Sequence, residues 1–434
     1  MGKYPKYFVD KLKNNLKIVT VPISKSSIIN ISIFINAGYG DENGKNVGVA
    51  HFLEHLIATD LREGELANKY FNNGIYFSAN ASTSTYRTIY YVTGDAKHGN
   101  KLLDLMLSIY LNRRIDTNII DRERNAIVVE MMSKSHSKEQ QMSSIILPKL
   151  LFGTKNHVIR DADLHVKNIY NITPNNLSKF MEDFYQPANT VIVISGNFER
   201  KNMISNITEQ LDKIPNKAVK LTRELSYNIG AKPKCYFMKD NRNINTVVIS
   251  FYAFKSHDYK NKYYSYYLSK ILSGIGSRSI LFQELRVKLG LTYSPNISIS
   301  VTKYYGTFDI VFNGKNEHIH KIMAQLINIL IHIKTKLLDN NFFSLVRSKY
   351  TLNVREHYDN ISPNAFSYYG NKILNKETIF TPLEIYDKFH KKTTPHNILN
   401  TAKKLFVKER ANMVILGKDD KKIEKVLLNL LNKL

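Results

Sequence analysis

The chain has 434 residues, 43% of them hydrophobic, and a formal net charge of +25. The apolar content excludes a largely disordered chain, and the length exceeds what one hydrophobic core usually organises, so we expect two domains. No apolar run is long enough to span a bilayer, and the first residues lack the apolar segment of a secretory signal. We therefore expect an intracellular protein with no membrane partner; the single cysteine, Cys235, excludes an intramolecular disulfide and fits a reducing compartment.

The strong positive charge raises the question of nucleic-acid binding. A basic chain attracts polyanions, but here the lysines are scattered along the whole sequence instead of forming one basic arm. None of the usual nucleic-acid recognition motifs is present. We therefore expect no specific nucleic-acid partner, and a basic nucleic-acid-associated protein is the weakest of the alternative functions.

In chain order, hydrophobic periodicity predicts the elements of the first half. They are a buried strand over 27–36, a helix from residue 48, a helix over 63–72, strands from 76 and over 88–93, and helices over 100–112 and 116–133.

The most informative segment is His51-Phe52-Leu53-Glu54-His55, at the start of the first predicted helix. On a helix, His51 and His55 lie one turn apart, so both imidazoles project from one face and two nitrogens can bind one metal ion. Glu54 faces the same site and is suited to take a proton from a metal-activated water. The order matches the inverted zincin motif His-x-x-Glu-His. The motif alone leaves a second interpretation open, in which both histidines are hydrogen-bonded core residues.

A third ligand is expected on the helix predicted over 116–133. Glu130 lies in an apolar stretch, where burial of a free carboxylate is costly unless it is paired or binds a metal. Two neutral imidazoles and one carboxylate would leave a fourth tetrahedral position for water, as in catalytic zinc sites. Glu123, two turns earlier on the same face, would orient a ligand or transfer a proton. The alternative is a salt bridge from Glu130 to Arg122 or Arg124.

The predicted strand from residue 76 contains small residues, including Asn80, Ala81 and Ser82. Small side chains would leave the backbone of an edge strand accessible, so that an extended peptide could bind by strand addition. A plain surface hairpin is the alternative, and spacing alone favours it.

Together these motifs resemble the pitrilysin and mitochondrial processing peptidase family of inverted zincins, in particular its short two-domain members. His51, Glu54 and His55 match the family motif, Glu130 falls where the family places its third ligand, and Glu123 matches the acidic residue seven positions earlier. The resemblance covers most of the chain. It also includes the opening strand (11–21), the lead-in to the motif (37–42), the strand that holds the substrate backbone (80–83) and the end of the first domain (185–196).

Some segments depart from the family pattern. Residues 57–60 replace the family's Phe-Lys-Gly-Thr, and only His157 remains of its His-Pro-Leu-Gly segment. These departures concern loop shape and substrate preference and leave the zinc ligands intact.

The second half repeats the first in outline but has no histidine motif. Residues 213–234 contain prolines, a glycine and several lysines and are expected to form a linker. Beyond it, the patterns predict strands over 246–252, 296–302, 307–312 and 411–416 and helices over 263–273 and 281–288. The fold class expected is α/β (α+β), with two homologous domains, each a mixed, mostly antiparallel sheet covered by helices. The catalytic domain would span 1–212 and the second domain 235–434.

The second half carries a stretch that resembles the family's substrate-binding segment. Arg286 and Tyr293 match its Arg/Tyr pair, whose hydrogen bonds would stabilise the developing oxyanion of a peptide carbonyl. A helix-end arginine and a core tyrosine are the alternative for each residue taken separately.

The resemblance implies a zinc-dependent endopeptidase that hydrolyses peptides or unstructured protein segments. Because a two-domain chain would need a second copy to close a substrate chamber, we expect a homodimer, or a heterodimer with a related subunit. The main alternative is a non-catalytic assembly subunit of the same family.

Overall fold

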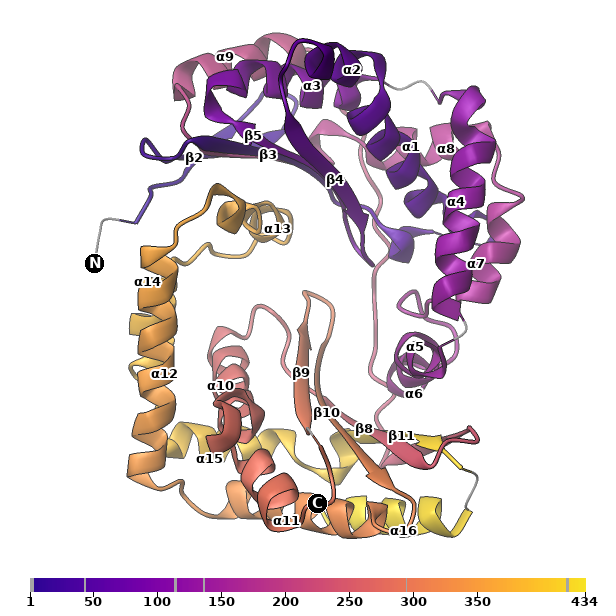
Figure 1. Ribbon diagram of the computed structural model, residues 1–434, viewed down its shortest axis with the longest axis vertical. Coiled ribbons are helices and arrows are strands. Elements are labelled where there is room, and N and C mark those ends of the chain that lie inside the picture. Colours follow the sequence, from indigo (N-terminus) through magenta and orange to yellow (C-terminus); the bar gives the residue numbers. More distant parts are fainter. Residues whose placement is uncertain (1–3, 43, 113–114, 136, 294, 419–420) are drawn as a thin grey trace. The chain divides into compact units, whose positions relative to one another are not determined.

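The computed structural model describes residues 4–42, 44–112, 115–135, 137–293, 295–418 and 421–434 (Figure 1). The chain divides into two compact units. The N-terminal unit comprises the described residues of 1–136, 160–223 and 358–379, and the C-terminal unit comprises those of 137–159, 224–357 and 380–434. Each unit is a sheet covered by helices, as expected for a mixed α/β fold.

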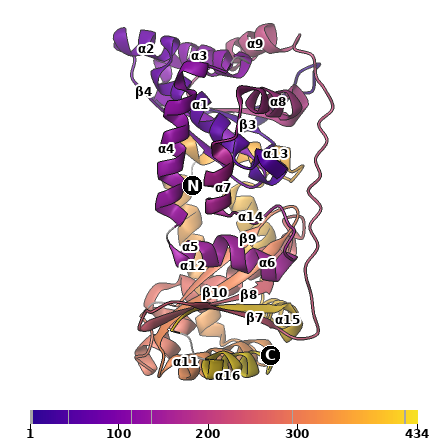
Figure 2. The same ribbon diagram turned by 90° about the vertical axis from the view of Figure 1, so that its right-hand side faces the viewer.

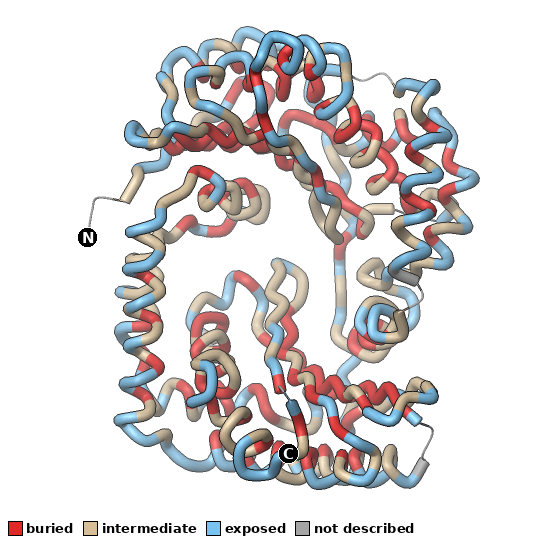
Figure 3. The backbone as a smooth tube through the Cα atoms, in the orientation of Figure 1, coloured by how far each residue is buried: buried red, intermediate tan, exposed pale blue. Residues whose placement is uncertain are grey.

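The N-terminal unit contains a six-stranded sheet in the order β1-β2-β6-β3-β5-β4. β2 and β6 are parallel, and the other neighbours are antiparallel. The strands are β1 (Phe8–Lys11), β2 (Lys17–Pro22), β3 (Ile28–Ile35), β4 (Phe77–Thr83), β5 (Thr88–Asp95) and β6 (Thr190–Gly196). The central strands β3 and β6 are rich in isoleucine and valine and are buried on both faces, which suits β-branched residues (Figure 3).

The helices of this unit are α1 (Val49–Glu63), α2 (Glu65–Asn72), α3 (Gly99–Leu111), α4 (Thr117–Ser135), α7 (Ala162–Ile169), α8 (Pro174–Phe184), α9 (Arg200–Leu211) and α13 (Tyr369–Leu374). One face of the sheet forms the main core with α1, α3 and α8, through residues such as Ile33, Phe52 and Leu103. The other face packs against Phe366 and Tyr369, from the segment 358–379 of the second half of the chain.

The C-terminal unit repeats this plan with five strands, in the order β7-β11-β8-β10-β9. Its strands are β7 (Lys234–Lys239), β8 (Ile244–Tyr252), β9 (Asn296–Val301), β10 (Gly306–Lys315) and β11 (Ala411–Gly417). The parallel pair β7–β11 and the antiparallel neighbours correspond in order to β2, β6, β3, β5 and β4 of the first sheet. The repeat predicted from the sequence therefore holds at the level of strand order.

Helices cover both faces of the second sheet. The helices of this unit are α5 (Lys138–Gln141), α6 (Leu147–Phe152), α10 (Tyr259–Ser269), α11 (Ile319–Thr335), α12 (Asn340–Asp359), α14 (Pro382–Ile385), α15 (Pro395–Leu405) and α16 (Lys421–Leu431). The main core lies between the sheet and helices that include α11 and α15. On the opposite face, Leu147 and Leu151 of α6 pack against Val248 and Tyr252.

The compact units differ from contiguous domains in two segments. Residues 137–159 precede the expected linker but belong to the C-terminal unit, and residues 358–379 belong to the N-terminal unit. The reason is apolar burial. Residues of 137–159 cover one face of the second sheet, and residues of 358–379 cover one face of the first sheet. The segment after α9 runs as extended chain without regular structure (Figure 2).

Most predicted elements are present within a few residues of their expected ends. The expected strand over 11–21 is instead the end of β1, a tight turn and β2; Asn15 in that turn has a positive φ of 74°, a conformation that asparagine tolerates. The expected helix over 281–288 is a π-helical stretch, Phe282–Lys288. None of the helices among the described residues is both long and apolar enough to cross a membrane.

Candidate metal centre

Helix α1 carries the histidine motif, and its first turn is held by Glu42. The N-cap residue is Gly48, whose φ of 105° favours glycine, and no side chain at that position caps the helix. Instead, the Glu42 carboxylate accepts hydrogen bonds from the backbone N–H groups of Gly48 and Ala50, both at 2.8 Å. Burial raises the pKa of Glu42 to about 8, although these two hydrogen bonds and Arg160 oppose the shift. Glu42 thus satisfies helix N–H groups that would otherwise lack partners.

The sequence of α1 determines which side chains reach the site. Phe52, Leu53 and Leu56 are buried in the main core, and this fixes the rotation of the helix. His51, Glu54 and His55 lie on the remaining face and are only partly buried.

Glu130 of α4 meets both histidines. Its Oε2 lies 3.2 Å from His55 Nε2 and 3.6 Å from His51 Nε2. The three residues each offer a ligand atom, and these atoms lie within 4.8 Å of one another; no other group of this kind occurs among the described residues. Two imidazoles and one carboxylate are the donor set of an open catalytic zinc site, so the residues present fit that ion.

The surroundings of Glu130 differ from the apolar environment expected from its neighbours. Val129 is 69% exposed, and the Glu130 side chain itself is 33% exposed, because only one side of α4 faces the core. The alternative, a salt bridge from Glu130 to Arg122 or Arg124, is not formed. Arg122 contacts Glu63 and Glu123, whereas Arg124 donates to the backbone carbonyls of residues 169 and 172.

Glu123 lies on the far side of the His55 ring from Glu130. It is buried, and its Oε2 is 3.4 Å from His55 Nδ1. Its other oxygen, Oε1, accepts a hydrogen bond from Arg122 Nε at 3.2 Å. Glu123 is therefore placed to orient His55 and does not join the ligand group.

Several carboxylates converge on His55. Burial alone would lower its pKa, but Glu130, Glu54 and Glu123 together raise it above its ordinary value. This excess of negative charge around two imidazoles is what a divalent cation would offset.

Glu54 lies between the ligands and strand β4. Burial raises its pKa, hydrogen bonds from the side chain and backbone of Thr83 and the charge of His55 oppose this, and the nearby Glu130 charge adds to it. A carboxylate with a raised pKa is suited to accept a proton at one step and return it at the next.

Strand β4 forms an edge of the first sheet, as the predicted substrate strand requires. Asn80 and Ser82 are exposed, whereas the Ala81 side chain is buried in the core. Only the backbone of Ala81 is therefore available to a bound peptide. Thr83, at the end of this strand, hydrogen-bonds to Glu54 through its side chain and its backbone.

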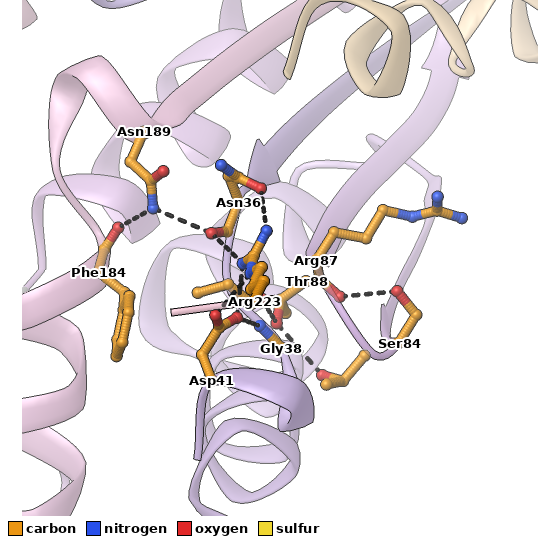
Figure 4. A network of polar contacts seen from close by, with 11 residues as sticks. Asn36, Gly38, Asp41, Ser84, Arg87, Thr88, Phe184, Asn189 and Arg223 are labelled. Carbon is orange, nitrogen blue, oxygen red and sulfur yellow. Dashed lines mark hydrogen bonds and ion pairs between the residues drawn. The ribbon is translucent and has the colours of Figure 1, made fainter. Parts of the chain in front are cut away.

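The loop before α1 is anchored by a network of buried polar groups (Figure 4). Arg223, in the segment expected to be a linker, donates to both carboxylate oxygens of Asp41 and to the side chain and carbonyl of Asn36. Asn189 donates to the carbonyls of Asn36 and Phe184. This network fixes the loop that ends in Glu42.

In the C-terminal unit, the predicted pair Arg286 and Tyr293 is brought together. The Arg286 guanidinium carbon lies 4.5 Å from the centre of the Tyr293 ring, in a cation–π contact. Tyr293 is 77% exposed, which rules out the core tyrosine considered as an alternative.

Sequence reasoning missed three residues of the first unit. Glu42 was quoted only as part of the lead-in pattern, and Thr83 only as part of the strand motif. His165 had no signal at all, yet its ring lies edge-on to His51 with centroids 5.4 Å apart. Helix-start signals concern the N-cap and the residue three positions after it, so they do not reach Glu42, which lies six residues before Gly48. Long-range packing alone places His165.

The fold and the site together place a group of candidate metal ligands, with the spacing of an inverted zincin, on one of two related α/β units. Residues 17–155 match the family model described as Insulinase (Peptidase family M16), and residues 171–349 match the one described as Peptidase M16 inactive domain. The chain belongs to this family, the pitrilysin or M16 metallopeptidases.

Individual relatives agree with this assignment. An uncharacterized zinc protease of Rickettsia bellii is 26% identical over 329 residues, which cover 74% of this chain and 76% of the relative. The mitochondrial-processing peptidase subunit beta of Saccharomyces cerevisiae is 29% identical over 209 residues, covering 47% of this chain and 44% of that protein. The crystal structure of a protease from Helicobacter pylori has a TM-score of 0.80 at 18% identity, covers 96% of this chain and 100% of that chain, and shows the same fold.

Proposed function

We propose that the chain is a zinc-dependent endopeptidase. The observation that carries the proposal is the convergence of His51, His55 and Glu130 within 4.8 Å, with Glu54 beside them. Zinc bound by these residues would supply a Lewis acid for the scissile carbonyl and lower the pKa of the attacking water.

In this mechanism the protein residues have separate tasks. An extended peptide lies along the free edge of β4, held by main-chain hydrogen bonds to residues 80–82. Glu54 accepts a proton from the water as it attacks the carbonyl carbon, and later delivers that proton to the leaving amine. Glu123 holds the His55 ring through Nδ1. The water adds to the acyl carbon, the C–N bond breaks, and the products are a carboxylate and an amine.

The test compares Glu54→Gln with the zinc-loaded parent on a library of quenched fluorescent peptides. We expect zinc content and fold to be kept and hydrolysis to fall roughly 10²–10⁴-fold, because the base is lost and the ligands are not. Glu209→Gln, an exposed position on α9, is the matched control and should cut normally. Unchanged hydrolysis by Glu54→Gln would refute the role of this residue.

The competing proposal is a non-catalytic assembly subunit. The match of residues 171–349 to a model described as an inactive domain is the observation in its favour. Against it stand the three ligands and Glu54, all present and assembled. A zinc-loaded parent that cleaves no peptide of the library would favour this alternative.

We also propose that the working form is a homodimer. The zinc ligands lie in one unit of the chain, and Arg286 and Tyr293 lie in the other. Two copies of one sequence, related by a two-fold axis, could exchange these contributions and build two equivalent sites.

A further inference from the structure

The turn between β4 and β5 lies directly after the residue that contacts Glu54. Strand β4 ends at Thr83, and residues 84–87 connect it to β5 in a tight turn, in which the backbone N–H of Ser84 donates to the carbonyl of Arg87 at 2.8 Å. Thr83 hydrogen-bonds to Glu54. A peptide held along β4 with its scissile bond beside Glu54 would therefore pass this turn on one side of that bond.

The turn ends with Arg87, whose guanidinium has no hydrogen bond or ion pair with any residue that the structure describes. Arg87 is partly buried, and burial lowers its pKa, whereas the nearby Tyr39 opposes this shift. The side chain points away from Asp41, whose carboxylate is already bound by Arg223 (Figure 4). Because arginine keeps its charge in proteins and a partly desolvated charge is unfavourable alone, Arg87 is suited to bind an anion.

A second arginine lies on the same tyrosine. The guanidinium carbon of Arg160 is 3.5 Å from the centre of the Tyr39 ring, and Arg160 is exposed. Its charge acts on the buried Glu42, but both Glu42 oxygens already accept hydrogen bonds from the backbone N–H groups of Gly48 and Ala50. Two guanidinium groups therefore act on one tyrosine, and no ion pair joins either of them to an acidic residue in the described part of the chain.

The hydroxyl of Tyr39 adds a hydrogen-bond donor. It accepts from the Thr85 hydroxyl at 2.7 Å, which leaves its own O–H available to donate. The backbone N–H of Tyr39 donates to the carbonyl of Ser84 at 3.2 Å, so the tyrosine is tied to the turn by its side chain and by its backbone. These groups are opposite in charge to the surroundings of His55, on which carboxylates converge.

We propose that Arg87, Arg160 and Tyr39 form a carboxylate-binding subsite for the peptide substrate, next to the turn after β4. The carboxylate would be that of an aspartate or glutamate side chain near the scissile bond, or the C-terminal carboxylate of a short peptide. Guanidinium–carboxylate hydrogen bonds are charge-assisted and can be two-pronged, so they would favour an acidic substrate over its amide counterpart. This inference rests on the proposed endopeptidase function and names a substrate class for it.

The test compares pairs of quenched fluorescent peptides that differ only in one carboxylate. Each pair has glutamate or glutamine at one position near the cleaved bond, and the pairs together cover both sides of that bond. The zinc-loaded parent should cleave the glutamate peptide of one such pair with a kcat/KM roughly 10–100-fold higher, as expected for hydrogen bonds to a charged group. A further pair with a C-terminal acid or amide distinguishes a terminal carboxylate from a side chain.

Arg87→Gln should reduce this ratio of kcat/KM values toward one. Arg62→Gln is the matched control, because it removes the same charge from an exposed position on α1, and its ratio should equal that of the parent. If Arg87→Gln does not fold, as judged by circular dichroism, Arg160→Gln at its exposed position takes its place and should also lower the ratio. A ratio of one for every pair in the parent, or an unchanged ratio in the folded variant, overturns the inference.

Failure of the proposed function gives a different result. If the zinc-loaded parent cleaves no peptide, the subsite is judged by binding instead, from the fluorescence anisotropy of labelled peptides of each pair. Tighter binding of the carboxylate peptide, lost in Arg87→Gln, would support the subsite although the endopeptidase fails. Equal affinities within every pair would overturn the subsite as well.

Discussion

Arg223 and Asp41 form a buried two-pronged ion pair, in which Arg223 Nε and Nη2 lie 2.6 and 2.5 Å from Oδ1 and Oδ2 of Asp41. Both side chains are 2% exposed. Asp41 directly precedes Glu42, the residue that caps α1. The pair therefore connects the segment after α9 to the loop that precedes α1, the helix that carries His51 and His55.

We expect Arg223→Ala to lower the free energy of unfolding of the N-terminal unit by about 3–5 kcal/mol, because it leaves a buried carboxylate without its partner. Urea unfolding measures the change. Lys13→Ala is the control: Lys13 pairs with Asp212 at 3.9 Å and is 92% exposed, so its loss should cost about 1 kcal/mol or less. Equal effects of the two substitutions would contradict the importance of the buried pair.

Glu130 and Glu123 should respond differently to the same substitution. Glu130→Gln removes a ligand, so the purified protein should lose most of its zinc, measured by elemental analysis after dialysis. Glu123→Gln removes only the support of His55 and should weaken zinc binding by about 10–100-fold. A Glu130→Gln protein with full zinc occupancy would show that the ligand assignment is wrong.

The free energy of unfolding of the C-terminal unit should depend on pH through the protonation of His390. Burial lowers its pKa from 6.5 to about 4, and its ring stacks on Tyr350 with centroids 3.9 Å apart. Because the unfolded chain binds a proton at higher pH than the folded one, the contribution of His390 is complete above pH 6.5. It is lost as the pH falls toward 4, by roughly 3 kcal/mol in total.

His390→Phe should remove this part of the pH dependence, measured as unfolding free energies at several values between pH 7 and pH 4. His320→Phe, at an exposed position of α11, should leave the profile unchanged. Parallel profiles for the parent and His390→Phe would contradict the prediction.

The homodimer predicts complementation between two inactive variants. Glu54→Gln and Arg286→Ala should each be nearly inactive alone. Co-expressed, their mixed dimers regain one working site, about a quarter of normal activity if subunits pair at random. If mixed dimers form and remain inactive, Arg286 does not serve the zinc of the other subunit.

Local sequence patterns determined much of this site. The spacing of His51, Glu54 and His55 places them on one helical face, because a helix turns once in about 3.6 residues. Alternation and β-branched runs likewise predicted the central strands and the edge strand β4, since these signals depend only on neighbouring residues.

Other features were decided by tertiary packing alone. The spacing of Glu123 and Glu130 left open which contacts α4 would make. In the folded chain, Glu130 contacts Nε2 of both His51 and His55, and Glu123 contacts Nδ1 of His55. His165 reaches His51, and Arg223 reaches Asp41, across more than a hundred residues of sequence. No local pattern encodes such contacts, because they depend on how apolar faces of distant elements bury one another.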